Sequence, residues 1–488
     1  MKKYVALGSL LLFSVFSIAQ PAPKPFGAVP APRQLKWHET DVYGLIHFTP
    51  TTFENKEWGY GDADPKIFNP TQFDAEKIVA ALKAGGLKAV ILVAKHHDGF
   101  ALWPTKTTNY NISLSPFRNG KGDMVKEFEQ ACRKFNMKFG VYCSPWDRNN
   151  AQYGTDAYVE IYRNQLRELY SNYGELFMSW HDGANGGDGY YGGAKTTKKI
   201  DRSTYYGWDT TWAITRKMQP HANIFSDIGW DVRWVGNERG FAAETSWATF
   251  TPVPAEGESK TVPGQLDDKQ NPFGTRNGNN WVPAECDVPL RKGWFYHPEE
   301  KDKVKKPEQL FDLYLKSVGR GGALDLGIAP NTLGLLSDED IASLKGFGRL
   351  VSESFKNNLA TTASIVSKET REKNFATKNL TDNNTNTYWA SRDEEHHPSI
   401  EFSWKEPVLF DLIRLREFIP LGQRVESLQV EIHDGKQWNK IAEATSIGAA
   451  RIIYLESPVK TNKARIMINA SPVCVTFSEI GFYKKSTL

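Results

Sequence analysis

The chain has 488 residues, 40% of them hydrophobic, and a formal charge of +3 at neutral pH. This length allows two or three domains with sizeable cores, because a domain typically has roughly 50–250 residues. The nearly balanced charge excludes nucleic acid or another polyanion as an expected partner. The cysteines, Cys132, Cys143, Cys286 and Cys474, lack C-x-x-C spacing, so we expect buried thiols rather than a zinc knuckle or a disulfide framework, with one disulfide as the alternative.

The first 20 residues are typical of a secretory signal peptide. Lys2 and Lys3 precede the apolar run YVALGSLLLFSVFSIA, and the small residue Ala19 suits cleavage nearby. The run is shorter than the ~20 residues of a membrane-spanning helix, and no cysteine follows it closely enough to carry a lipid anchor. We therefore expect export to the periplasm or the medium, a Pro-rich leader over 21–34 and no membrane insertion after cleavage; an uncleaved anchor helix is the alternative.

Between residues 35 and 355, apolar runs alternate with amphipathic ones. The apolar runs predict strands, and the segments with apolar residues at three- and four-residue spacing predict helices. Such alternation is typical of a parallel α/β architecture. The expected strands end at Phe48, Phe100, Asp147, Gly183, Asp231 and Pro330, and the expected helices cover 73–87, 124–137, 156–173 and 205–218.

Polar and aromatic residues gather where the expected strands end. In a (β/α)₈ barrel the active site is built from the carboxyl ends of the strands and the loops that follow them. An open doubly wound sheet obeys a related rule, but no G-x-G-x-x-G follows the first expected strand. We therefore predict an α/β, TIM-barrel-like catalytic domain over 35–355, whose strand ends carry His47, His96, His97, Tyr142, Asp147, Trp180, Asp182 and Asp227.

The sequence pattern changes near residue 355. One more helix is expected just before this point, beginning at the capping-box-like pair Ser337 and Asp340. Beyond it the helical spacing disappears, and short apolar runs follow at regular intervals with turn residues between them. This pattern predicts an all-β sandwich over 356–488.

A metal site is one interpretation of the polar strand ends. Adjacent strand residues point to opposite faces, so His96 and His97 would share an ion only if the strand had ended before them. The sequence also lacks H-x-H and H-E-x-x-H spacing. We therefore keep a metal-dependent hydrolase as an alternative and expect no metal in the barrel; its candidate ligands are His47, His96, His97, Asp98, His181 and Asp182.

A pair of carboxylates, the minimal equipment for cleaving a glycosidic bond, is the second interpretation. Asp182 ends a buried strand before a glycine-rich turn, and Trp180 beside it has an indole that can pack on a sugar ring and donate its N–H. Capping of that turn is the structural alternative for Asp182. The stretch DVRWVGNERGFAAETSW supplies Glu238 and Glu244 as partners, and an ion pair with one of its two arginines is the alternative for Glu238.

Aromatic residues in the loops favour a carbohydrate site, because sugars present C–H faces that pack on aromatic rings. An ordinary large core would explain any single one of them. Their position beside carboxylates and histidines favours the sugar interpretation. These residues are Phe53, Trp58, Tyr60, Trp103, Tyr142, Trp146, Trp180, Trp230, Trp234 and Trp294.

The motifs resemble those of glycoside hydrolase family 29, the α-L-fucosidases. GLIHF is similar to the first-strand histidine motif of that family, KHHDGFALWPTKTTNYN to its second-strand signature, and ELFMSWHDGANG to its nucleophile strand, over roughly residues 35–350. The resemblance implies that Asp182 is the nucleophile. The predicted substrate-binding residues, which would hold the fucose hydroxyls and pack on its ring, are His47, Glu57, Trp58, His96, His97, Tyr142, Trp180 and Arg233.

Within that family, DVRWVGNERG resembles a narrower branch that removes α-1,3/1,4-linked fucose from Lewis-type glycans. The glutamate of this loop is the acid/base there, which implies Glu238. In the broad branch the nucleophile strand ends in Asp-x-Gly-Trp, and residues 227–230 mimic that ending, so Asp227 is a rival nucleophile. Strand order and the position of Trp180 favour Asp182.

The resemblance therefore implies an exo-acting, retaining α-L-fucosidase that acts on fucosylated oligosaccharides or glycoconjugates and requires no cofactor. A carbohydrate-binding protein on a decayed hydrolase scaffold is the alternative from another class.

Residues 357–488 are similar to discoidin-like, galactose-binding sandwiches. The segments NLTDNNTNTYWAS, RLREFIPLGQRVESLQVEI and VTFSEIGFY carry this likeness. Some relatives bind sugar and some hold Ca²⁺ in a loop like 382–387, so a structural Ca²⁺ in this domain is one prediction. A domain that only supports the barrel is the alternative.

Overall fold

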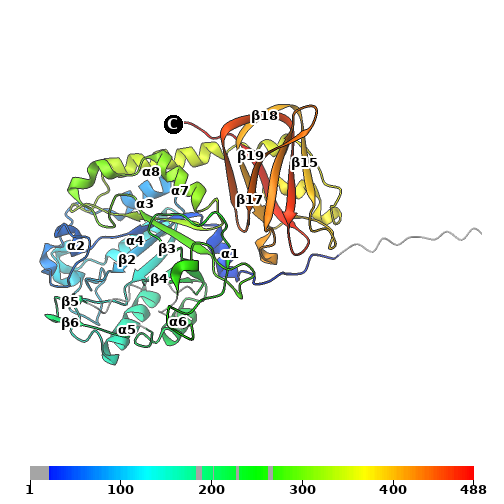
Figure 1. The fold of residues 1–488 in the computed structure, drawn as a ribbon. Helices are drawn as coiled ribbons and strands as arrows, with labels where there is room; N and C mark the ends of the chain where they lie inside the picture. Colours follow the sequence, from blue (N-terminus) through cyan, green and yellow to red (C-terminus); the bar gives the residue numbers. More distant parts are fainter. Residues whose placement is uncertain (1–20, 183–188, 202, 227–229, 262–266) are drawn as a thin grey trace, which may run out of the picture.

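The computed structural model describes residues 21–182, 189–201, 203–226, 230–261 and 267–488. The chain forms a barrel surrounded by helices and then an all-β domain that packs beside it (Figure 1). None of the helices in these ranges combines the length and the apolar character needed to cross a membrane. The predicted signal peptide lies outside the described residues.

Eight parallel strands form a closed barrel in the order β1-β12-β11-β8-β7-β4-β3-β2. Pairing of β1 with both β2 and β12 closes it. The TIM-barrel-like prediction is confirmed. The barrel strands are β1 (Val42–Ile46), β2 (Ala89–Lys95), β3 (Lys138–Cys143), β4 (Met178–His181), β7 (Asn223–Ser226), β8 (Val232–Trp234), β11 (Ala284–Pro289) and β12 (Ala323–Ile328).

Helices cover the outside of the barrel (Figure 1). The four predicted barrel helices form with shorter ends, as α3 (Ala75–Ala84), α4 (Met124–Lys134), α5 (Asp156–Asn172) and α6 (Trp208–Met218). The expected capping box, in which the Ser337 hydroxyl accepts from the Asp340 N–H, starts α8 (Asp338–Ser354). The structure also contains α1 (Pro32–His38), α2 (Pro50–Phe53) and α7 (Pro307–Lys316).

Two strands of the barrel were not expected from the sequence. β8 has only three residues, which is too short for a recognisable pattern. β11 reads AECDVP, and its two acids, Glu285 and Asp287, are buried inside the barrel, so it lacks the apolar run of a buried parallel strand. The described residues between β7 and β8 and between β8 and β11 contain no α-helix, so the barrel departs from a regular (β/α)₈ order there.

Alternation along each strand separates two cores. In β1, Tyr43 and Leu45 belong to the cluster inside the barrel, whereas Val42 and Ile46 belong to the cluster under the helices. Each strand therefore buries both faces, which explains why most of them read as continuous apolar runs. All four cysteines are buried and free, which confirms the expectation of buried thiols.

The C-terminal domain is a seven-stranded antiparallel arrangement with its own apolar core. The strands pair in the order β14-β19-β15-β18-β16-β17, and β13 pairs with β15. Asp382 in the proposed Ca²⁺ loop accepts hydrogen bonds from the Asn384 N–H and the Thr387 hydroxyl. The strands are β13 (Ser364–Val366), β14 (Trp389–Ala390), β15 (Ser399–Glu417), β16 (Ser427–His433), β17 (Trp438–Thr445), β18 (Arg451–Ala470) and β19 (Thr476–Tyr483).

A long loop between β8 and β11, residues 235–283, lies against the C-terminal domain. It includes the short strands β9 (Thr249–Phe250) and β10 (Asn280–Trp281); a further pair, β5 (Gly189–Tyr191) and β6 (Thr196–Lys198), lies after β4. The Ala248 N–H donates to Gln423 Oε1 at 2.9 Å, and Glu244 pairs with Arg451. These contacts tie the loop to the sandwich.

A buried ion pair fixes the end of β2. Lys95 Nζ lies 3.3 Å from Asp147 Oδ2 and donates to Tyr158 at 3.1 Å and to Gln165 at 2.8 Å, and both charged side chains are almost fully buried. This pair holds the end of β2 against α5.

We predict that Lys95→Met destabilises the barrel by about 3–5 kcal/mol, because it leaves the buried Asp147 charge unpaired. Lys95→Met/Asp147→Asn should recover part of this loss, since the introduced amide is neutral and keeps an oxygen for the loop N–H groups. The urea midpoint, followed by tryptophan fluorescence, measures both. Equal shifts for the single and double variants would contradict this account.

Candidate active site

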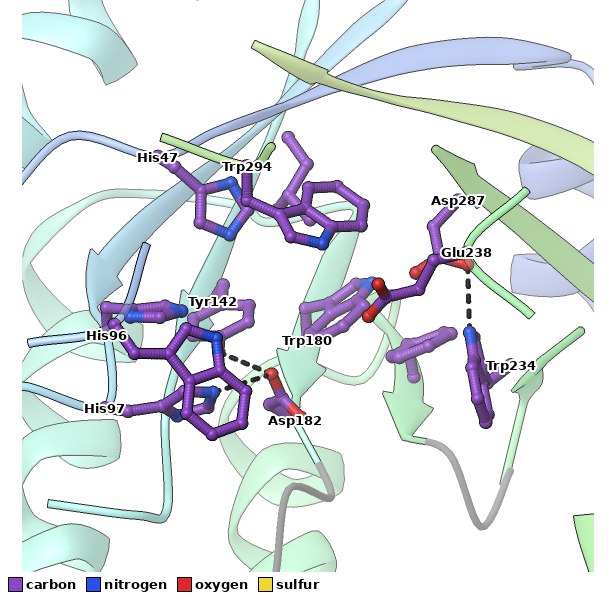
Figure 2. Close-up of a pocket in the computed structure, with 13 residues that line it drawn as sticks. His47, His96, His97, Tyr142, Trp180, Asp182, Trp234, Glu238, Asp287 and Trp294 are labelled. Carbon is purple, nitrogen blue, oxygen red and sulfur yellow. Dashed lines mark hydrogen bonds and ion pairs between the residues drawn. The ribbon is translucent and has the colours of Figure 1, made fainter. Parts of the chain in front are cut away.

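A cavity of about 210 Å³ opens at the carboxyl ends of the barrel strands (Figure 2). Pockets for drug-sized ligands have roughly 300–1,000 Å³, so this one suits a small ligand such as one sugar ring. Residues far apart in the sequence meet here. The lining residues are Leu45, His47, Trp58, His96, His97, Tyr142, Trp180, Asp182, Phe225, Trp234, Glu238, Asp287 and Trp294.

Asp182 is the first residue after β4 and faces the cavity. The Tyr142 hydroxyl donates to Asp182 Oδ2 at 2.6 Å, and His97 Nε2 lies 3.4 Å from the same oxygen. The Asp182 side chain keeps 24% of its surface exposed. The carboxylate is therefore held in one orientation and still open to a ligand.

Stacked aromatic rings form the floor beside Asp182. Tyr142 stacks on Trp180 with ring centroids 4.9 Å apart, and Trp180 stacks on Phe225 at 4.0 Å. The indole N–H of Trp180 donates to Glu285 at 2.7 Å, deep in the barrel. The expectation that this N–H is offered to a ligand is therefore wrong, although the indole still lines the cavity.

The adjacent histidines both face the cavity because β2 ends at Lys95, one residue before His96. Strand alternation therefore does not separate them, and their ring centroids are 4.1 Å apart. His97 Nδ1 pairs with the Ser144 hydroxyl at 2.8 Å, whereas Nδ1 of His47 and of His96 has no hydrogen-bond partner in the described part of the chain. All three rings line the cavity, where a ring nitrogen can meet a ligand hydroxyl.

Burial keeps these histidines neutral. It lowers the pKa of His47 to about 3, with a further contribution from a charge on His97. It lowers the pKa of His97 to about 4 against the opposing effect of Asp182, and it lowers the pKa of His96 well below its usual value. A neutral imidazole has one donor and one acceptor nitrogen, which matches a hydroxyl group.

Glu238 reaches the same cavity from the loop that follows β8 (Figure 2). Loss of solvent around its carboxyl group raises its pKa, and the negative charges of Asp182 and Glu57 raise it further. A hydrogen bond from the Trp294 indole opposes this shift. The raised pKa favours a protonated Glu238 facing Asp182.

The predicted substrate-binding residue Arg233 lies outside the cavity lining. Its side chain is fully buried and donates to the backbone carbonyls of Asn271 at 2.9 Å, of Trp247 at 3.0 Å and of Val282. We correct its role to support of the long loop 235–283. Arg239 lies over the Phe241 ring, so the structure pairs neither arginine with Glu238.

Glu57 lies beside the cavity rather than in its lining. Its carboxylate accepts from the backbone N–H groups of Trp294 and Phe295 and pairs with His297 Nε2 at 3.0 Å. It therefore holds the loop that brings Trp294 to the cavity. Trp58, the next residue, is 49% exposed and packs edge-on against His97.

The other acids and histidines of the predicted strand ends have structural partners. Asp98 accepts from the hydroxyls of Thr49 and Thr51, and His181 points away from the cavity to Tyr162. Among the residues described, no three His, Cys, Asp or Glu side chains are grouped as metal ligands would be. The rival nucleophile Asp227 lies outside the described residues.

Sequence reasoning missed three lining residues, Leu45, Phe225 and Asp287. The first two are ordinary apolar strand residues with no distinguishing signal. Asp287 had a signal, since an acid alternating with Glu285 in a short β-prone stretch indicates a strand whose polar face points into a barrel.

Comparison with known proteins identifies the barrel as the catalytic domain of a glycoside hydrolase. Residues 13–354 match the family model of α-L-fucosidases, and residues 361–479 match that of F5/8 type C domains. The chain is 36% identical to α-L-fucosidase 1 of Arabidopsis thaliana over 473 residues, which cover 96% of this chain and 90% of that protein. It therefore belongs to the α-L-fucosidase family, glycoside hydrolase family 29, and is an α-L-fucosidase.

Solved structures show the same architecture over nearly the whole chain. A glycoside hydrolase 29 family member from an unknown rumen bacterium is 37% identical, with a TM-score of 0.83 over 95% of this chain and 79% of that chain. A Ruminococcus gnavus family 29 fucosidase, solved in complex with fucose, is 28% identical, with a TM-score of 0.85 over 96% and 97% of the two chains. Both domains are therefore shared with known relatives.

We predict that Tyr142→Phe lowers kcat/KM on an aryl α-L-fucoside roughly 10- to 150-fold, because a hydrogen bond to a charged group contributes about 1.5–3 kcal/mol. Tyr110→Phe is the matched control. It also removes a buried hydroxyl, but one without a hydrogen-bond partner in the described structure, so activity should persist. Similar losses in both variants would argue against a specific role for the Tyr142 hydroxyl.

Proposed function

We propose that this α-L-fucosidase removes α-1,3/1,4-linked fucose from Lewis-type glycans by a retaining double displacement. The observation that carries the mechanism is that Asp182 and Glu238 line one cavity from two separate loops. The likeness of DVRWVGNERG to the narrower branch supports the linkage preference. The small cavity supports exo action, because it accommodates one terminal sugar.

In the first step, Asp182 attacks the anomeric carbon while the bond to the departing sugar breaks. Tyr142 and His97 orient the attacking carboxylate. Glu238 gives its proton to the departing oxygen, so the leaving sugar departs as a neutral alcohol. The products of this step are a covalent fucosyl-enzyme and an ionised Glu238.

In the second step, the Glu238 carboxylate takes a proton from water, and the water oxygen attacks the anomeric carbon. Asp182 departs as a carboxylate, and Glu238 is protonated again. Two displacements at the same carbon return its original configuration. A retaining pair is expected to have carboxyl groups about 5–5.5 Å apart.

The neutral histidines and the apolar floor suit the substrate we propose. The rings of His47 and His96 line the cavity, where each can meet a sugar hydroxyl. Leu45 and Phe225 give the cavity an apolar side for the methyl group of fucose. This chemistry uses carboxyl groups alone, so we propose that activity in the barrel survives a chelator and that no cofactor is required.

The first 20 residues support a further proposal, that the enzyme is exported to the periplasm or the medium and there meets fucosylated oligosaccharides or glycoconjugates.

We predict that Asp182→Ala lowers kcat by about 10⁴-fold or more, since the reaction loses its covalent nucleophile. Glu238→Ala should lose about 10²- to 10⁴-fold on an oligosaccharide, and added azide should partly restore turnover of an aryl fucoside by replacing water. The product should be the α-fucosyl azide, because both displacements still occur at the anomeric carbon.

Glu244→Ala is the matched control for Glu238→Ala. Glu244 lies in the same loop but pairs with Arg320 and Arg451 away from the cavity, so azide should not alter the rate of this variant. Full activity of Asp182→Ala, or a β-fucosyl azide from Glu238→Ala, would refute the assignment of the two carboxyl groups.

The linkage preference is tested with α-1,2-, α-1,3-, α-1,4- and α-1,6-fucosylated oligosaccharides at equal concentration. We expect the highest kcat/KM for the α-1,3 and α-1,4 linkages in branched glycans. Faster release from α-1,2 or α-1,6 linkages would refute the preference and leave the α-L-fucosidase activity intact.

A further inference from the structure

The cavity contains a third carboxyl group that the proposed mechanism does not use. Asp287 on β11 lines the cavity together with Asp182 and Glu238, and only 4% of its surface is exposed. Its Oδ1 accepts a hydrogen bond from the Trp234 indole at 2.9 Å. Asp287 and Glu238 lie on the side of the cavity away from the histidines (Figure 2), near enough for a charge on Glu238 to raise the pKa of Asp287.

The charged groups that face Asp287 in the described structure are acids. Glu285 precedes it by two residues on the inner face of β11, Asp325 is its register partner on β12, and Glu238 lies on the loop after β8. Burial raises the pKa of Asp287 well above its usual value, and negative charges on Glu285 and Glu238 raise it further. These effects favour the neutral carboxylic acid form of Asp287, which has an O–H group to donate.

We propose that Asp287 is a positioning residue for the acid/base Glu238, to which it donates a hydrogen bond when Glu238 becomes a carboxylate. This inference rests on the function proposed above. Glu238 becomes ionised when it has protonated the departing oxygen, and at that moment it gains an acceptor oxygen beside a neutral acid. The proton stays on Asp287, and the hydrogen bond both stabilises the new charge and aims the carboxylate at the incoming water.

Trp234 determines which oxygen of Asp287 accepts a hydrogen bond and which one can carry the proton. Its N–H occupies Oδ1 of Asp287, so that oxygen is held as an acceptor. The proton is then carried by the other oxygen of Asp287. An ionised Asp287 could not act in this way, because two adjacent carboxylates would repel each other and disfavour ionisation of Glu238.

The decisive experiment compares leaving groups. Asp287→Ala should lower kcat/KM roughly 10- to 150-fold on a fucosylated oligosaccharide, whose poor leaving group needs a well-placed acid. On 2,4-dinitrophenyl α-L-fucoside, whose leaving group departs without a proton, the loss should be below about 3-fold. Equal losses on both substrates, or none on either, would overturn the proposal in favour of a structural role or no role.

Asp287→Asn is the conservative variant. Its amide keeps an oxygen for the Trp234 N–H and an N–H₂ group for Glu238, so it should recover most of the oligosaccharide activity lost in Asp287→Ala. An Asp287→Asn variant as slow as Asp287→Ala would overturn the neutral-donor role. Because Asn is close to a carboxylic acid in shape, this comparison also separates loss of the donor from disturbed folding.

The pH profile gives an independent readout. A hydrogen-bond donor stabilises the ionised form of Glu238 and so lowers its pKa. Asp287→Ala should therefore move the alkaline limb of the kcat/KM profile to higher pH. Asp287→Asn keeps a donor and should leave the limb in place. A shift to lower pH in Asp287→Asn would show that Asp287 is ionised in the native enzyme and would overturn the proposal.

A double-mutant cycle tests whether Asp287 acts through Glu238. Asp287→Ala should cause no further loss in a Glu238→Ala background, and an additive loss would overturn the proposal. Failure of the proposed function would be visible separately, because azide would then not rescue Glu238→Ala even with Asp287 intact.

Discussion

Closure of the barrel through β1 is the constraint on which the site depends. β1 pairs with β2 on one side and with β12 on the other, so every strand end faces one common mouth. Asp182 and Glu238 are 56 positions apart in the numbering, yet both reach the same cavity. Without closure between β1 and β2, the histidines after β2 and the tryptophan after β11 would lie several strands apart in an open sheet.

Loss of solvent determines which side chains are charged at the mouth of the barrel. Burial makes the neutral form of His47, His96 and Asp287 the stable one, as it disfavours any unpaired charge. The Tyr142 hydroxyl and His97 hold the Asp182 carboxylate in place, and part of its side chain stays exposed to the cavity. The cavity therefore presents mainly uncharged groups, which suit an uncharged sugar, and the mechanism that we propose uses two of its carboxyl groups.

The sequence predicted the parts of this arrangement that have a period or a motif. Alternating apolar and amphipathic runs indicated the barrel, and the residues after β1 to β4 were found because each follows a recognisable strand. β8 and β11 were missed because one is three residues long and the other buries acids where a parallel strand normally buries apolar side chains. Asp287 was missed with β11, since the position of a side chain relative to the cavity depends on a strand that the pattern did not show.

Two predictions from the sequence were wrong about where a side chain points. Arg233 lies on β8 next to the inward-facing Trp234, and alternation turns its guanidinium outward to the carbonyls of the long loop. The N–H of Trp180 points down the barrel because Glu285, from the missed strand β11, lies there as an acceptor. Both outcomes depend on non-local partners that a single sequence does not pair.

The loop that carries Glu238 shows why the second domain belongs to the catalytic unit. The described part of residues 235–283 contains no α-helix, although a helix would normally follow a barrel strand. Arg233 on β8 holds this loop through its backbone carbonyls, and the sandwich holds it through Gln423 and Arg451. The acid/base role that we propose for Glu238 requires placement to within about half an ångström, and a loop reaches that precision only when other elements fix its backbone. The sandwich therefore contributes to the geometry of Glu238 whether or not it also binds a sugar of its own.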